Sequence, residues 1–167
     1  VYEEIKSDLK INQVVLMLHG YGADAKDFLS LANYWHRFLP NTLFVAPNAP
    51  RKCQINSAGY EWFDLMQTDK NKTKKELIES VDKLKILTDK ILKKYNLKYK
   101  DVIYVGFSQG TMLAIHTAIN SVELVKGVLG YSGKIYDHQL LLNSINSKVK
   151  IFMIHGSKDE VIPLEQM

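Results

Sequence analysis

Cysteine is almost missing from this chain of 167 residues, because Cys53 is its single thiol. One thiol excludes an internal disulfide and is typical of a reducing compartment. No apolar run reaches the roughly 18 residues that a membrane-spanning helix needs, and no signal peptide is recognisable at the start. We therefore expect a cytoplasmic protein with no integral membrane segment.

Strong charge of one sign is also missing. The net charge is only +4, and the lysines concentrate between residues 70 and 100, as expected for the solvated face of a helix. No basic patch is interleaved with aromatic residues, so we expect no nucleic-acid partner. The sequence also lacks metal-ligand spacing, a Walker motif and a dinucleotide fingerprint, so we predict no metal and no cofactor.

Apolar residues make up 46% of the chain, enough for one domain with a sizeable core. Uniformly apolar runs alternate with segments of helical periodicity, which predicts an α/β protein with a mostly parallel sheet and helices on both faces. Residues 1–10 resemble the end of an edge strand or a linker. The expected strands are 14–18, 42–46, 102–105, 127–129 and 149–154.

Two of the expected helices have recognisable starts. The first begins at Asp24, continues to Pro40, and places Phe28, Leu31, Trp35 and Phe38 on one face toward the core. The next begins with a capping box formed by Thr73 and Glu76, and buries a stripe from Leu77 to Tyr95. Between 47 and 69 the chain shows no periodicity, and a connection of that length is usually functional or mobile.

The most informative stretch is Gly106-Phe107-Ser108-Gln109-Gly110. This Gly-x-Ser-x-Gly pentad lies between an expected strand and an expected helix, which is the context of a nucleophile elbow. The turn is tight enough to need glycine at its flanks and a strained backbone at the serine. Ser108 would then present its hydroxyl at a helix N-terminus, where a developing negative charge is favoured. The alternative interpretation is an ordinary strand-to-helix loop.

Further blocks occur with this pentad in a fixed order along residues 14–164. Together they resemble the phospholipase/carboxylesterase family of α/β-hydrolases, which includes acyl-protein thioesterases and small bacterial carboxylesterases. Glutamine directly after the serine and the Trp-Phe-Asp block are the more specific elements. The blocks are His19-Gly20-Tyr21-Gly22, Pro47-Asn48-Ala49-Pro50, Trp62-Phe63-Asp64, the pentad, Tyr131-Ser132-Gly133 and His155-Gly156-Ser157-Lys158-Asp159.

The resemblance implies a function and a set of roles. The protein would cleave carboxylic esters or thioesters through an acyl-enzyme on Ser108, with Asp159 as the acid of the triad. The backbone N–H groups of Tyr21 and Gln109 would form the oxyanion hole, so the side chain of Gln109 is not required for that task. Trp62 and Phe63 would wall the acyl pocket, although aromatic residues in a long loop are also often a satellite core.

The sequence departs from the family at the catalytic base. The triad of this fold runs in the order serine, acid, histidine, yet none of the residues 160–167 is histidine. The five histidines all precede Asp159, and His138 is the only loosely placed one. We therefore expect an incomplete copy of a longer enzyme, a single α/β-hydrolase domain over 1–167 without its last strand, base and helix. The activity of this chain is accordingly doubtful, and the strand at 149–154 would be an exposed apolar edge.

Three interpretations follow. The first is a carboxylesterase or acyl-thioesterase acting on a small ester or thioester, an acylated protein or a lysophospholipid. The second is a non-catalytic remnant or binding protein that keeps the fold without the base. The third is a hydrolase whose substrate is a lysophospholipid or a lactone. A homodimer is plausible through the exposed sheet edge.

Overall fold

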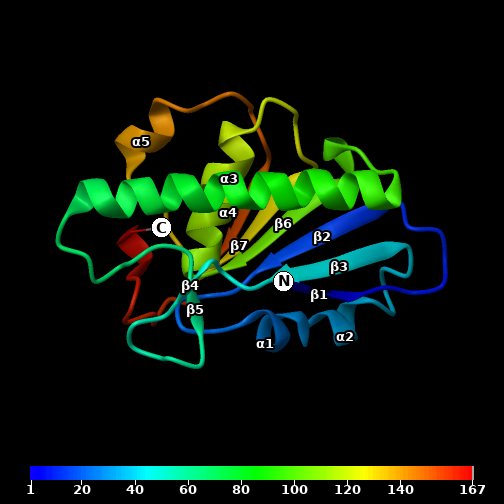
Figure 1. Ribbon diagram of the computed structural model, residues 1–167, viewed down its shortest axis with the longest axis horizontal. Coiled ribbons are helices and arrows are strands. Elements are labelled where there is room, and N and C mark those ends of the chain that lie inside the picture. The colour runs from blue at the N-terminus through cyan, green and yellow to red at the C-terminus, as the bar shows by residue number, and fades with distance from the viewer. Residues whose placement is uncertain (167) are drawn as a thin grey trace.

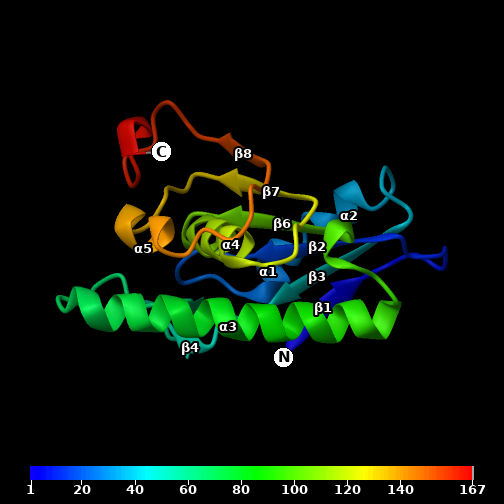
Figure 2. The same ribbon diagram turned by 90° about the horizontal axis from the view of Figure 1, so that it is seen from above.

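The computed structural model describes residues 1–166, and its centre is a six-stranded sheet with the order β1-β3-β2-β6-β7-β8. Figure 2 shows β8 at one edge and β1 at the other. β1 is antiparallel to β3, and the remaining neighbours are parallel, which confirms the predicted mostly parallel sheet. The strands are β1 (Tyr2–Ile5), β2 (Gln13–Leu18), β3 (Thr42–Pro47), β6 (Val102–Phe107), β7 (Gly127–Tyr131) and β8 (Ile151–Ile154).

Helices lie on both faces of the sheet, α3 above it and α1 and α2 below it in Figure 1. The alternation of side chains along β2 explains why the strand is apolar throughout. Val14 and Leu16 pack with α3 and α4, whereas Val15 and Met17 pack with α1 on the opposite face. The helices are α1 (Ala25–Leu29), α2 (Ala32–Trp35), α3 (Lys70–Tyr95), α4 (Gln109–Asn120) and α5 (His138–Leu142), with short 3-10 turns at Tyr99–Asp101 and Leu164–Gln166.

The first predicted helix is two short helices, and its predicted core face is partly wrong. Asp24 does cap α1, since its side chain accepts from the N–H of Asp27. Between α1 and α2, Ser30 and Leu31 keep helical dihedral angles, but their N–H groups donate to carbonyls three residues back, and this tighter turn changes the helical phase. Leu31 and Phe38 are consequently exposed, by 38% and 73%. The residues that this segment buries are Ala25, Leu29 and Ala32.

The predicted start of α3 is also wrong. The helix begins at Lys70, and Asp69 caps it by accepting from the N–H of Asn71. Thr73 and Glu76 face the preceding loop instead. The Thr73 hydroxyl lies near the carbonyl oxygens of Asp64 and Asp69, and Glu76 accepts from the N–H of Asp64. The predicted buried stripe of α3 is confirmed, with Leu77, Val81, Leu84 and Ile91 inside.

The long connection after β3 contains a small hairpin that the sequence does not indicate. β4 (Arg51–Lys52) pairs antiparallel with β5 (Tyr60–Glu61). β5 also bonds to the loop after β2, because the N–H of Gly22 donates to the carbonyl of Tyr60 over 2.9 Å. The connection is therefore built against the end of the central strand rather than being free.

β8 is the exposed apolar edge that the sequence predicts. Phe152 is 65% exposed and Ile154 42%, although both belong to a strand that pairs with β7. Along residues 1–166, no helix combines the length and the apolar character that crossing a membrane requires.

Candidate active site

The nucleophile elbow is present at the junction of β6 and α4. Ser108 has φ 51° and ψ −114°, a conformation that costs free energy for any residue with a Cβ. Its N–H donates to the carbonyl of Tyr131 at the end of β7 over 2.8 Å, which helps to hold the turn. The side chain of Ser108 makes no capping bond to α4. The hydroxyl is thus available for chemistry at the helix N-terminus.

Both glycines of the pentad are required by close backbone contacts. A Cβ on Gly106 would lie 2.4 Å from the nitrogen of Thr111, and a Cβ on Gly110 would lie 2.0 Å from the carbonyl oxygen of Leu18. These are distances that no side chain accommodates. The pattern therefore reflects an elbow packed directly against the central strand, and it excludes a loose Gly-Ser loop.

The loop after β2 lies against this elbow. β2 and β6 are neighbouring parallel strands, with Leu18 opposite Gly106, so their carboxyl ends lie side by side at the same end of the sheet. A Cβ on Gly20 would lie 2.9 Å from the ring of Phe107, which confirms the close approach. Among residues 1–166, neither the Tyr21 nor the Gln109 backbone N–H has a hydrogen-bond acceptor. These are the two donors predicted to form the oxyanion hole.

Asp159 follows β8, at the same carboxyl end of the parallel strands. Its Oδ1 accepts from the backbone N–H groups of Val161 and Ile162, at 3.0 and 2.9 Å, and its Oδ2 lies 3.4 Å from Nε2 of His155. The bond from Ile162 contributes most to a pKa below the ordinary range of a carboxyl, with smaller contributions from Val161, His155 and Ser132. Asp159 is therefore ionised at neutral pH.

Four of the five histidines contact the backbone through a ring nitrogen, among them His36, over 3.4 Å to the carbonyl of Asn33. In His19, Nε2 accepts from the N–H of Ala49 and Nδ1 contacts the carbonyl of Gly20, and burial lowers its pKa. His116 contacts the carbonyl of Tyr136, and burial lowers its pKa as well. His155 bonds to a carbonyl over 2.6 Å. The rings of His19, His116 and His155 therefore have structural positions.

Trp62 and Phe63 are core residues, 3% and 0% exposed. The Trp62 indole N–H donates to the carbonyl of His19 over 2.9 Å, and the two rings lie 5.1 Å apart. Phe63 packs against Tyr136 at 5.0 Å. The role of the pair as walls of an acyl pocket stays a prediction.

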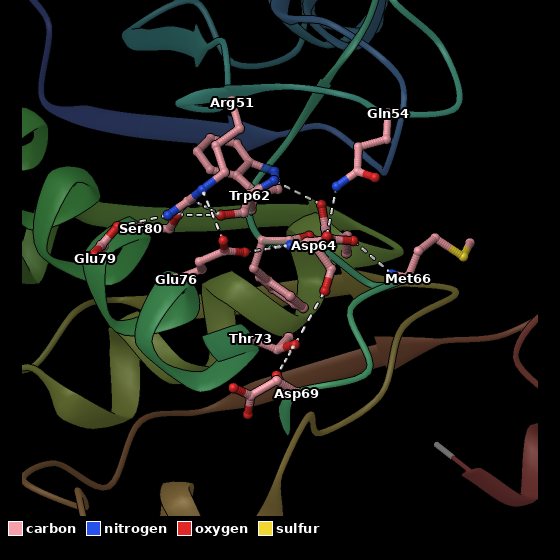
Figure 3. A network of polar contacts seen from close by, with 12 residues as sticks. Arg51, Gln54, Trp62, Asp64, Met66, Asp69, Thr73, Glu76, Glu79 and Ser80 are labelled. Carbon is pink, nitrogen blue, oxygen red and sulfur yellow. Dashed lines mark hydrogen bonds and ion pairs between the residues drawn. The ribbon is translucent and has the colours of Figure 1, made fainter. Parts of the chain in front are cut away.

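Sequence reasoning missed the groups that hold Trp62. Its carbonyl accepts from Nη1 of Arg51 over 2.8 Å and from the hydroxyl of Ser80 on α3, and Arg51 is itself paired with Glu79 at 2.7 Å. Figure 3 shows Arg51 reaching between Trp62 and the two glutamates of α3. The partners lie 11 to 29 residues apart, so no local pattern in the sequence could have indicated them.

The side chain of Tyr21 points into a buried polar cluster with Cys53 and Glu61. Burial raises the pKa of Tyr21 well above its ordinary value, and the neighbouring thiol and carboxylate act in the same direction. Cys53 is 3% exposed and Glu61 2%. The Tyr21 phenol is therefore neutral.

A strained serine between a parallel strand and a helix, beside a loop in which the Tyr21 N–H has no acceptor within the described part of the chain, defines an α/β-hydrolase. The acid after a later strand of the same sheet fits that class. The comparisons with known proteins give the family. Residues 2–167 match the phospholipase/carboxylesterase family, and the chain belongs to it.

Relatives and solved structures agree with this membership. Acyl-protein thioesterase 1 of Emericella nidulans is 26% identical, with 93% of this chain and 73% of the relative covered. Acyl-protein thioesterase 1 of Saccharomyces cerevisiae is 29% identical, over 91% and 72%. The crystal structure of esterase PE8 superposes with a TM-score of 0.90 and 34% identity, covering 98% of this chain and 78% of that one.

Proposed function

We propose that this protein is a serine hydrolase that cleaves carboxylic esters or thioesters of acyl chains through an acyl-enzyme on Ser108. The observation that carries the proposal is the backbone of Ser108, held at φ 51° between β6 and α4. Strain of this kind persists only where the surrounding structure enforces it, and it clusters at catalytic positions. Gly106 and Gly110 leave no room for a Cβ, so the close packing around them holds Ser108 in this conformation.

The reaction has two halves. Ser108 Oγ forms a bond to the acyl carbonyl carbon while a general base takes its proton, and the carbonyl oxygen becomes an oxyanion. The N–H groups of Tyr21 and Gln109 are the proposed donors to that oxygen. The C–O or C–S bond then breaks, and the leaving alcohol or thiol takes up the proton. Water cleaves the acyl-enzyme in the second half and releases the carboxylic acid.

Asp159 is the proposed acid of the triad, because it is ionised and lies past the end of β8. An ionised carboxylate is what orients and stabilises the protonated base in this mechanism. His19, His116 and His155 have structural bonds to the backbone, so we assign the base to none of them. The alternative is a non-catalytic protein with the hydrolase fold, and labelling of Ser108 decides between the two.

The substrate class rests on the relatives. Two of them are named acyl-protein thioesterase 1 and the structural neighbour is named an esterase. We therefore propose a small ester or thioester, with an acylated protein as one form of it and a lysophospholipid as the alternative. A cytoplasmic setting and a homodimer through the β8 edge stay predictions.

The test uses a fluorescent organophosphonate on the complete protein. We expect covalent labelling of the wild type and hydrolysis of a short-chain ester, with both lost in Ser108→Ala. Ser121→Ala is the matched control, because Ser121 is a buried serine at the other end of α4. Ester hydrolysis that survives Ser108→Ala contradicts the proposal, and so does a folded wild type that neither reacts nor hydrolyses.

A further inference from the structure

The two proposed donors of the oxyanion hole belong to different elements. Tyr21 lies in the loop after β2, whereas Gln109 is the first residue of α4. Donors act on an oxyanion only within a narrow distance, about 2.7 to 3.1 Å, so the two elements must be held in a fixed relation. The structure contains a connection between them that does not pass through the sheet.

That connection is Trp62, which bonds to both elements at once. Its indole N–H donates to the carbonyl of His19 in the loop, and its backbone N–H donates to Oε1 of Gln109, each over 2.9 Å. Both bonds are buried. Buried bonds of this kind have no competing water and therefore hold their geometry.

Both the oxygen and the nitrogen of the Gln109 carboxamide are bonded in this connection. While Oε1 accepts from Trp62, Nε2 donates to the carbonyl of the next residue, Phe63, over 2.6 Å. Gln109 is 0% exposed. The carboxamide thus binds backbone groups of two successive residues, the N–H of Trp62 and the carbonyl of Phe63, and only one orientation of the amide satisfies both.

The 62–63 segment is anchored on its other side, so it is suitable as a fixed reference. The carbonyl of Trp62 accepts from Arg51 and from Ser80 of α3, and Arg51 is paired with Glu79 (Figure 3). Immediately before it, β5 holds the oxyanion loop by two backbone bonds, from Gly22 to Tyr60 and from Tyr60 to Ala23, both 2.9 Å long.

We propose that the side chain of Gln109 is a positioning group for the oxyanion hole. By binding Trp62 and Phe63, the carboxamide fixes the relation between the backbone N–H of its own residue and that of Tyr21. This inference rests on the proposed function, and it corrects the expectation that the Gln109 side chain is not required for the hole. Gln109 acts through the two donors and does not itself need to touch the substrate.

The first variant is Gln109→Met, which keeps the backbone donor and the unbranched shape but loses both side-chain bonds. We expect kcat for an ester to fall on the order of tenfold, less than the roughly 100-fold or more for deleting a donor. The specific readout is the ratio of rates for an ester and for the matching thionoester. Sulfur is larger and accepts hydrogen bonds poorly, so a well-formed hole prefers the ester, and a loosened hole loses part of that preference.

Thr117→Val is the matched control. Thr117 is also 0% exposed on α4, and its hydroxyl donates to the carbonyl of Leu113 within the helix, away from the hole. We expect this variant to lower the melting temperature without changing the ester-to-thionoester ratio. Rates are divided by the concentration of sites titrated with organophosphonate, so that unfolded protein does not count.

The second variant, Gln109→Glu, supplies a rescue that depends on pH. A neutral carboxylic acid can accept from Trp62 and donate to Phe63, as the carboxamide does, whereas a carboxylate places negative charge against the Phe63 carbonyl. Burial favours the neutral form. We therefore expect kcat relative to wild type to be near one at acidic pH and to fall as pH rises and the side chain ionises.

The outcomes separate the two proposals. If the wild type hydrolyses esters and Ser108→Ala does not, the proposed function stands. An unchanged ester-to-thionoester ratio in Gln109→Met would then overturn the positioning role alone, as would a Gln109→Glu variant whose relative kcat does not depend on pH. A lower ester-to-thionoester ratio in the Thr117→Val control would also overturn the positioning role. General destabilisation of α4 would then be enough to explain the lower ratio in Gln109→Met.

Discussion

The two halves of the sheet differ in how they are covered. In the half formed by β3, β2 and β6, helices pack on both faces, and residues 14–18 of β2 are at most 3% exposed. In the half formed by β7 and β8, α4 covers one face of β7, while Phe152 and Ile154 of β8 are largely exposed. Strands of similar apolar composition thus have very different surroundings.

The proposed catalytic groups are divided between these halves. Ser108 and the loop that carries Tyr21 follow β6 and β2, two strands of the half that is covered on both faces, whereas Asp159 follows β8, the least covered strand. A tight elbow and two spaced donors require a rigid support, and the doubly covered half provides it. The acid is instead fixed locally, by two N–H groups of its own turn.

The largest expected effect compares two glycines, one from each half. Gly110→Ala places a Cβ 2.0 Å from the carbonyl oxygen of Leu18, and both residues are buried where α4 packs against β2. We expect a loss of more than about 4 kcal/mol of unfolding free energy, or no folded protein. In Gly156→Ala after β8, the nearest atoms to the new Cβ are 4.0 Å away, so the change is expected within about 0.5 kcal/mol.

Urea denaturation followed by tryptophan fluorescence measures both variants. Similar losses of unfolding free energy in Gly110→Ala and Gly156→Ala would contradict the difference between the two halves, because the two positions would then tolerate a side chain equally well.

Much of this fold could be predicted from the sequence, because the central strands are apolar on both faces and therefore unmistakable. The errors fall where a local signal competes with a distant partner. Thr73 and Glu76 have the spacing of a capping box, but Glu76 binds the N–H of Asp64 in the preceding loop. The hairpin of β4 and β5 has only two residues in each strand, too few for a periodic signal.

The candidate site also has a part that can be predicted from the sequence and a part that cannot. The elbow is predictable because its chemistry and its turn geometry are encoded in five consecutive residues. The function of the Gln109 side chain is not, because its partners Trp62 and Phe63 lie 47 and 46 residues earlier in the chain. A polar residue that is fully buried beside the proposed nucleophile is the one available signal, and burial itself is known only from the structure.

An intermediate effect compares two phenylalanines of the same sheet. Phe44 of β3 is 0% exposed, and Phe152 of β8 is 65% exposed. Phe44→Ala opens a cavity in a packed layer, and we expect it to cost about 3 to 5 kcal/mol of unfolding free energy. Phe152→Ala removes a side chain that is mostly in solvent, and its expected cost is about 0.5 kcal/mol or less. A large loss for Phe152→Ala, measured by urea denaturation, would mean that something covers this face in solution.

The smallest expected effect concerns Asp159 and depends on pH. Its pKa in the folded protein is lower than in the unfolded chain, chiefly through the N–H of Ile162. A carboxyl of this kind stabilises the fold at pH values above its unfolded pKa, and the contribution disappears as pH falls through the folded pKa. Asp159→Asn should therefore lower the melting temperature slightly at neutral pH, and the gap to wild type should close in acid. Because the carboxylate is partly exposed, solvent screens its interactions and the gap is small. A gap that widens on acidification would reverse the sign, and would mean that the turn after β8 favours the protonated acid instead of the ion that a catalytic triad needs.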